Sequence, residues 1–330
     1  MRNLLLGRLL PALMIAVAAG AAGFAAGAQD KPKPIERTLK VNEVARVGQS
    51  VITAEDFIER LLEVERILYA DRRNGGMVID DLVAERMLEL EAERIGITVK
   101  PRETGDEEGE LNKLWQGEFQ RWNDEVVADQ RKRGAKEQKK TWQEFLRDRF
   151  GMTDADYKRW LNVTAKRNLK LRLVVNYWED SNERAEAWGL RVESKELAAQ
   201  IRQRLTQGES FTNLARNHSN ESRTREVGGR IGNVWRNDGR LDAEVEPVFW
   251  KLKKDGISEP VETPHGWWLV VRKEGRLANE APFWDLREEL LKRPNVDQNR
   301  FQAWRNAVAA SGRYAYERRM PGWDCAANQP

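Results

Sequence analysis

The sequence predicts an α+β protein, in which a helical module precedes a small domain built around an antiparallel sheet. Between about residues 53 and 177, apolar residues recur with the spacing of one helix face. From Ala185 onward, short apolar runs typical of strands are interleaved with short helical patterns and glycine turns. With 330 residues, the chain is long enough for two modest domains.

The composition is that of a globular protein with a strongly hydrated surface. Charged residues make up 33% of the chain and hydrophobic residues 40%. A formal net charge of +3 is small for this length, so we predict no nucleic-acid partner. Residues 131–140 contain the dense basic run of the sequence. We interpret this run as a solvated helix face, with contact to an acidic partner as the alternative.

The first 28 residues have the pattern of a signal peptide. Arg2 and Arg8 precede an apolar run that ends in Ala-Gly-Ala at residues 26–28, the form of a cleavage site. A polar, proline-containing linker follows at residues 29–40. We therefore predict a periplasmic or secreted protein with no stable membrane insertion after cleavage. The alternative is an uncleaved anchor, because about 20 apolar residues can just span a bilayer.

Few residues of this chain are suited to metal or disulfide chemistry. Cys325 is the sole cysteine, so it has no partner for an intramolecular disulfide. It is remote in sequence from His218 and His265, the two histidines of the chain. We therefore predict no metal site.

Residues 41–182 are predicted to be mainly helical after a short strand at 44–48. Thr53 and Asp56 stand at the two ends of a capping-box pattern, which starts the first helix. A second helix is predicted to stop at Gly96. Further helical segments are predicted around 114–126, from Thr141, and from 152 to about 177.

The helical module carries a surplus of large aromatic side chains, namely Trp115, Phe119, Trp122, Trp142, Phe145 and Trp160. Lone helices in a polar region do not need so many. We expect some of them to form an exposed concave patch that binds client polypeptides, since exposed apolar patches usually mark interaction surfaces. The alternative is that all of them pack into one core.

Residues 183–275 are predicted to form the sheet domain. Strands are expected at 187–192, from the glycine turn at 228–232 to Trp235, at 257–261 and at 267–272. Helices are expected after Ser194, from Phe211 and around 245–249. Residues 276–330 are predicted to be helical, at about 283–291 and again after Asp297.

Three motifs follow one another within the predicted sheet domain. Residues 208–216 read G-E-S-F-T-N-L-A-R, residues 228–232 read G-G-R-I-G, and residues 256–267 read G-I-S-E-P-V-E-T-P-H-G-W. In order and spacing these resemble the motifs of parvulin-type (PpiC, rotamase) peptidyl-prolyl isomerases. The resemblance implies a four-stranded antiparallel sheet with surrounding helices.

The flanking regions resemble the SurA/PrsA group of exported foldases. The matching segments are residues 45–53, 83–88 and 92–99. This resemblance implies a SurA N-like chaperone module at 41–182, and a C-terminal segment at 276–330 that packs on it. It also implies unfolded or extracytoplasmic polypeptides as clients. The stretch at 103–140 departs from the family pattern.

The residues that the family uses for catalysis are replaced in this chain. Parvulins line their pocket with two facing histidines and a Cys or Asp. The two histidine positions here hold Gly189 and Trp268, and the Cys or Asp position holds Glu221. The reaction is rotation about an X–Pro amide, whose barrier is about 20 kcal/mol, and it needs no cofactor. Glu221 is the remaining candidate catalytic group, with a solvated loop acid as the alternative.

The positions that line the pocket of the family with apolar side chains also hold apolar residues in this chain. The resemblance assigns substrate binding to Ile231, Leu241, Val245, Thr263 and Trp268. An indole at position 268 would stack on a proline or an aromatic ring; the alternative is a core residue. The two histidines of the chain are motif neighbours of the family pair, and we expect both to be exposed at a loop or helix end.

An apolar pocket without its hydrogen-bonding pair should bind peptide without turning it over rapidly. We therefore predict an exported folding helper, mainly chaperone-like, that binds unfolded or proline-containing polypeptides and has weak or absent isomerase activity. One alternative is an active peptidyl-prolyl cis–trans isomerase. Another is an envelope interaction or scaffold protein with one fixed partner.

Overall fold

The computed structural model describes residue 39 and residues 42–68, 75–100 and 103–318. The predicted signal peptide, nearly all of the predicted linker and Cys325 lie outside these residues. Within them, the predicted α+β class is confirmed, because long helices accompany a four-stranded and a three-stranded antiparallel sheet.

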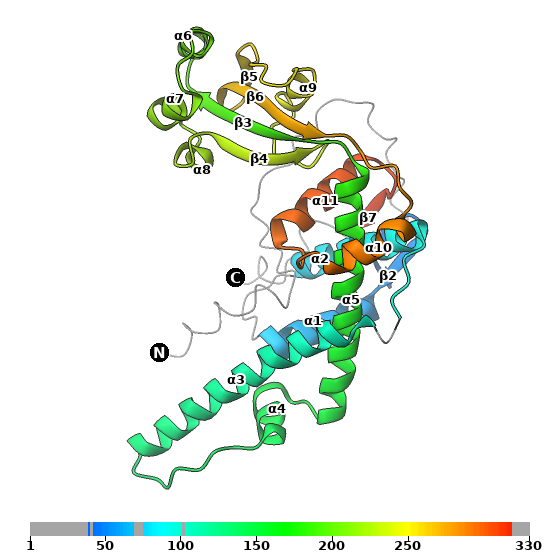
Figure 1. The fold of residues 1–330 in the computed structure, drawn as a ribbon. Helices are drawn as coiled ribbons and strands as arrows, with labels where there is room; N and C mark the ends of the chain where they lie inside the picture. Colours follow the sequence, from blue (N-terminus) through cyan, green and yellow to red (C-terminus); the bar gives the residue numbers. More distant parts are fainter. Residues whose placement is uncertain (1–38, 40–41, 69–74, 101–102, 319–330) are drawn as a thin grey trace.

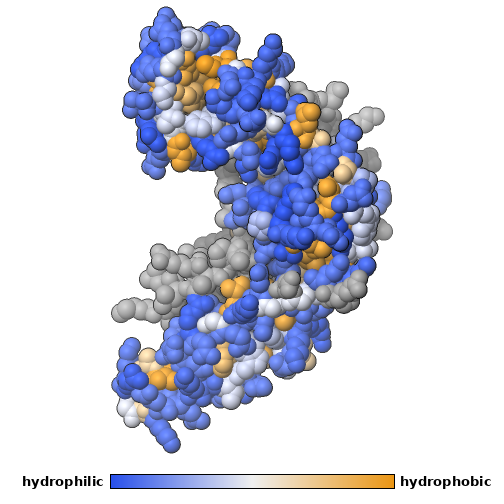
Figure 2. All heavy atoms as spheres, viewed as in Figure 1, coloured by the Kyte–Doolittle hydropathy of each residue, from blue (hydrophilic) through white to orange (hydrophobic). Residues whose placement is uncertain are grey.

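A long helix, α5 (Asp154–Ser181), connects the parts of the molecule (Figure 1). The sheet domain follows its C-terminal end, and α3 (Gly105–Lys132) and α4 (Trp142–Phe150) extend beside its N-terminal half. We call α3, α4 and the N-terminal half of α5 the arm. In the space-filling view the molecule is a crescent with the sheet domain at one end and the arm at the other (Figure 2). Hydrophilic residues cover most of the visible surface.

The two ends of the described chain meet in a small sheet with strand order β2-β1-β7. A hairpin of β1 (Glu43–Val47) and β2 (Ser50–Thr53) leads into α1 (Ala54–Leu68), which the predicted capping box starts. The Thr53 backbone N–H donates to Asp56 at 2.8 Å, and the Asp56 N–H donates back to Thr53 Oγ1 at 3.2 Å. The strand β7 (Tyr316–Arg318) pairs with β1 and lies in the segment predicted to be helical. That short edge strand is formed only by its pairing with β1, so no local sequence pattern predicts it.

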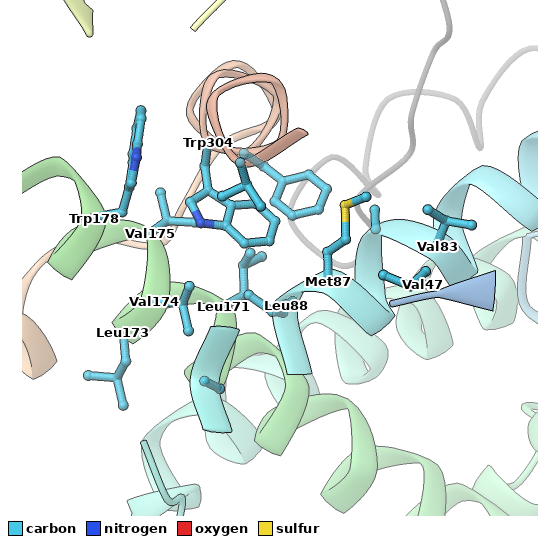
Figure 3. Close-up of a cluster of buried hydrophobic side chains, with 14 of the residues drawn as sticks. Val47, Val83, Met87, Leu88, Leu171, Leu173, Val174, Val175, Trp178 and Trp304 are labelled. Carbon is cyan, nitrogen blue, oxygen red and sulfur yellow. The ribbon is translucent and has the colours of Figure 1, made fainter. Parts of the chain in front are cut away.

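The central hydrophobic core lies between α5, α2 (Gly75–Ile95) and the C-terminal helices (Figure 3). These helices are α10 (Phe283–Lys292) and α11 (Gln298–Ala310). Trp304 of α11 is fully buried and lies over Val175 and Leu171 of α5 and beside Leu88 of α2. The C-terminal segment is therefore part of the same core as the N-terminal helices.

The arm has a hydrophobic core of its own. Within it Trp115, Phe145, Tyr157 and Trp160 are buried, and Phe119, Trp122 and Trp142 pack partly buried around them. The expectation of an exposed aromatic patch is therefore wrong for most of these side chains, because α3, α4 and α5 turn them toward one another. The stretch at 103–140, which departs from the family pattern, is mainly helix α3 and its return to α4.

The sheet domain has the strand order β4-β3-β6-β5 and is antiparallel throughout. Its strands are β3 (Arg184–Val192), β4 (Arg230–Trp235), β5 (Val261–Thr263) and β6 (Gly266–Arg276), and its helices are α6 (Lys195–Thr206), α7 (Phe211–His218), α8 (Ser222–Arg225) and α9 (Glu246–Phe249). One sheet face packs on α6 and α7, and the other on the segment that contains α9. The predicted strand at 257–261 is wrong: β5 begins only at Val261, and Ile257 makes an isolated bridge to Val271. Pro260 has no N–H to contribute to a ladder there.

The sheet domain is joined to the central core by side chains as well as by the chain. Trp235 at the end of β4 belongs to the central core, with its ring 5.3 Å from that of Trp178 in α5. Its indole N–H donates to the Glu179 carbonyl at 3.1 Å. Arg276 at the end of β6 pairs with Asp180 at 2.7 Å. In the described ranges, no helix has the length and apolar character needed to span a membrane.

Candidate functional site

The two positions that correspond to the family histidines lie on neighbouring strands. Gly189 is on β3 opposite Val270, and Trp268 is on β6 opposite Arg191. Side chains alternate across a sheet, so positions 189, 191, 268 and 270 share one face. This face carries the hydrophobic cluster formed with the α9 segment.

The side chain of Trp268 is buried inside this cluster. It is 5% exposed, and its indole N–H donates to Asp242 Oδ2 at 2.9 Å. A β-carbon placed on Gly189 would lie 2.8 Å from Cζ3 of Trp268 and 2.9 Å from Cδ1 of Ile231. Separations this short do not occur between unbonded carbons, so the Gly189 position leaves no room for a side chain while the indole is in place.

Three predicted lining residues lie in the same cluster as the indole. Leu241 and Val245 are buried, and Ile231 is partly buried against them. Thr263 has a different position: it is buried at the β5–β6 turn, where its hydroxyl donates to the Gly266 carbonyl at 2.8 Å. The structure thus brings together the apolar lining and Trp268, and places Thr263 in the adjacent turn.

Glu221 is not a solvated loop acid, as the alternative interpretation held. It is 4% exposed and caps the N-terminus of α8, where its side chain accepts a hydrogen bond from the backbone N–H of Arg223 at 3.3 Å. Its carboxylate also pairs with the guanidinium groups of Arg191 and Arg223, each at 3.1 Å. Burial alone would raise the pKa of this carboxyl, but the hydrogen bonds from Arg223 and the charge of Arg191 lower it below its ordinary value. Glu221 is therefore ionised and its oxygens are engaged.

Comparison with known proteins decides the family of this domain. Residues 181–274 match the family described as "Rotamase: PPIC-type PPIASE domain". These residues form a parvulin-type rotamase domain. The prediction made from the three motifs is confirmed.

Beyond this domain, the chain is similar to PrsA foldases over most of its length and to a SurA chaperone over a shorter stretch. It is 24% identical over 263 residues to the foldase protein PrsA of Geobacillus sp. (strain WCH70), covering 79% of this chain and 82% of that protein. The foldase protein PrsA of Caldanaerobacter subterraneus is 30% identical over 198 residues, which are 60% of this chain and 56% of that protein. The chaperone SurA of Methylococcus capsulatus is 32% identical over 109 residues, which are 32% of this chain and 23% of that protein. The match to the solved structure of PrsA from Bacillus anthracis covers 70% of this chain and 97% of the PrsA chain. The sequence identity is 18% and the TM-score is 0.30.

Two residues of the rotamase domain that hold the site together were missed by sequence reasoning. Asp242 accepts the Trp268 indole N–H, and Arg191 places its guanidinium carbon 5.7 Å from the centre of the indole ring. Because Arg191 also pairs with Glu221, it connects the indole to the acid at the Cys or Asp position of the family. The sequence signal for Arg191 was its place two residues after Gly189 on a strand, which puts both on one face.

The two histidines of the rotamase domain lie away from the indole. His218 ends α7, where its Nε2 is 3.1 Å from Arg204 Nη1, and His265 is exposed in the β5–β6 turn. Among the described residues, no group of three His, Cys, Asp or Glu side chains is placed to hold a metal ion. A shallow depression of about 440 Å³ lies elsewhere in the domain, along β6 between Glu183 and Leu277.

Proposed function

We propose that this chain is an exported folding helper that binds unfolded or proline-containing polypeptides, and that its rotamase domain has weak or absent isomerase activity. The observation that carries the proposal is the pair Gly189 and Trp268, which stand where parvulins have their two histidines. Similarity to PrsA and SurA proteins supports the role in folding.

The chemistry of the site supports a domain that does not turn over prolyl bonds rapidly. An isomerase must favour the twisted amide over the planar one, and it does so with polar groups aimed at the changing amide. Glu221 is the candidate catalytic group, and both its oxygens face arginines. The Thr263 hydroxyl donates to the Gly266 carbonyl. Asp242 is occupied by the Trp268 indole N–H. We therefore assign Glu221 no proton-transfer role.

We assign client binding mainly to the helical module at 41–182 with the C-terminal segment 276–330, and only weakly to residues 183–275. The aromatic residues of the arm form its own core, so the binding surface has to come from other side chains. Ile58 and Leu62 stand one turn apart on α1 and are 54% and 45% exposed, which supports a contact surface on this module. A long arm also suits extended clients better than a small pocket does.

The test is an isomerase assay on short Xaa-Pro peptides, with aggregation suppression measured on the same preparation. We expect suppression together with turnover far below that of a histidine-bearing parvulin assayed in parallel. Rapid turnover that disappears in Glu221→Ala would make the chain an active isomerase with Glu221 as its catalytic group. No suppression, together with capture of one stoichiometric partner, would instead make it a scaffold protein.

A further inference from the structure

The indole of Trp268 fills a space that its neighbours leave open for it. Gly189 contributes no side chain, and a β-carbon there would stand 2.8 Å from Cζ3 and 3.2 Å from Cε3 of the indole. Ile231 reaches the same point from β4, with its Cδ1 2.9 Å away. The indole and the isoleucine side chain therefore both pack over Gly189, and together they fill the space at this point.

The indole is held in one orientation. Its N–H bonds to Asp242 at 2.9 Å, and the guanidinium of Arg191 lies over the ring at 5.7 Å from the ring centre. The backbone of Trp268 lies between two strands, opposite Val261 of β5 and Arg191 of β3. A buried indole needs a partner for its N–H, and Asp242 provides it at the edge of the cluster. Rotating the ring out would break this bond and expose apolar surface.

The ring belongs to the same hydrophobic cluster as the residues that the family resemblance assigns to proline binding, Ile231, Leu241 and Val245. A flat apolar ring buried in one cluster with these three side chains is the kind of group that such a pocket accepts from a substrate. Trp268 comes from the protein itself, so it occupies the pocket at no cost in association entropy. A prolyl ring from a client has to compete against an intramolecular group that is always present.

We propose that Trp268 is a built-in occupant of the prolyl pocket, and that a client proline enters only when this indole is displaced. The proposal rests on the proposed function and on the prolyl pocket that the parvulin resemblance assigns to these residues. It adds that the rotamase domain is closed to prolyl peptides by its own side chain, and that loss of its histidines is not the sole cause of low activity. Removing the indole should therefore create prolyl binding without restoring rapid isomerisation.

The experiment uses the mature full-length chain with Trp268→Ala and, as a smaller reduction in volume, Trp268→Leu. The probe is acetyl-Ala-Pro-Ala-amide, with acetyl-Ala-Ala-Ala-amide as the peptide control. Binding is followed through the methyl NMR signals of Ile231, Leu241 and Val245. We expect the prolyl peptide to bind the folded variants at least about tenfold more tightly than the wild-type chain. The peptide without proline should not show this gain.

The matched control is Trp267→Ala, because Trp267 is the same residue type one position earlier and packs on the opposite sheet face with the α6 and α7 cluster. This variant should bind the prolyl peptide no better than wild type does. The wild-type chain tests the proposal even if both Trp268 variants unfold, since its Leu241 and Val245 signals should not respond to the prolyl peptide. A wild-type response equal to that of the variants would overturn the proposal, and so would folded variants that do not prefer proline. Aggregation suppression by wild type is measured separately, and its loss would contradict the proposed function but not the occupied pocket.

Discussion

Cζ3 of Trp268 lies 2.8 Å from the point where a β-carbon of Gly189 would stand. The two positions are therefore coupled. The absence of a side chain at Gly189 allows the indole to pack there, and no side chain fits at position 189 while the indole is in place. The backbone at Gly189 is not left-handed, unlike that of Gly228 and Gly229, so the constraint is steric and comes from the indole and Ile231.

We predict that Gly189→Ala lowers the free energy of unfolding by about 1–3 kcal/mol, because one added methyl group forces the anchored indole or Ile231 to shift. In a Trp268→Leu background the cost should fall, with a coupling of about 1 kcal/mol between the two sites. Urea denaturation of the two single variants and the double variant measures this coupling. Gly109→Ala is the control, since Gly109 is in α3 with open space around it and should gain stability. Additive effects at positions 189 and 268 would contradict the steric account.

We predict that acid weakens the contact between α2 and the C-terminal segment. Glu91 of α2 is 3% exposed and accepts hydrogen bonds from Arg313 at 2.9 Å and from the Tyr314 hydroxyl at 2.7 Å. Burial alone would raise the pKa of Glu91, but the bonds from Arg94 and Tyr314 and the charge of Arg313 lower it below its ordinary value of 4.5. The unfolded state then binds more protons in acid. The stabilisation is present above pH 4.5 and is lost as the pH falls through the lowered pKa.

The variant that checks this is Glu91→Gln, which should lose about 1–3 kcal/mol at neutral pH because buried partners lose a charged acceptor. Its unfolding free energy should then change less than that of wild type between neutral pH and the acid range. Glu93→Gln serves as the control, since Glu93 is an exposed glutamate on the same helix. Equal pH dependence in wild type and Glu91→Gln would rule out Glu91 as the source.

We predict that a chain in which a short Gly/Ser linker replaces residues 183–275 still suppresses aggregation. Arg184 and Arg276 are register partners on β3 and β6, so the two ends of the excised segment are adjacent and a short linker can join them. The deletion also removes Trp235 from the central core, where it contacts Trp178. Full-length Trp235→Ala is the control for that loss, which should cost about 3–5 kcal/mol. If the shortened chain folds and no longer holds clients, the binding surface belongs to the rotamase domain.

We predict that the mature chain begins at Gln29 and leaves the cytoplasm, because Ala26-Gly27-Ala28 has the form of a cleavage site. Replacing both alanines, Ala26→Lys with Ala28→Lys, should leave the precursor uncut. Gly27→Ser, at the variable middle position, should be processed normally. N-terminal sequencing of the exported protein measures all three, and an intact Met1 terminus in the wild-type membrane fraction would show an uncleaved anchor instead.

Local signals in the sequence were sufficient to predict most helices and the family of the sheet domain. The capping boxes of Thr141 with Glu144 and Thr153 with Asp156 start α4 and α5, and each is complete within four residues. Three motifs of short span located the rotamase domain and placed Gly189 and Trp268 at its two histidine positions. These features depend on neighbouring residues, so they can be predicted without the fold.

Contacts between distant residues were decided only by the tertiary structure. The strand β7 exists because Arg318 meets Ala45, and the arm aromatics are buried because three helices converge. The sequence left Glu221 as either a catalytic candidate or a loop acid, and Trp268 as either a stacking surface or a core residue. The fold buries Glu221 beside Arg191, and it buries Trp268 against Asp242 and the bare Gly189 position. The sequence by itself indicated which side chains line the proposed pocket. Whether that pocket is open to a prolyl ring depends on how strands far apart in the chain pack together, and local sequence patterns do not predict that packing.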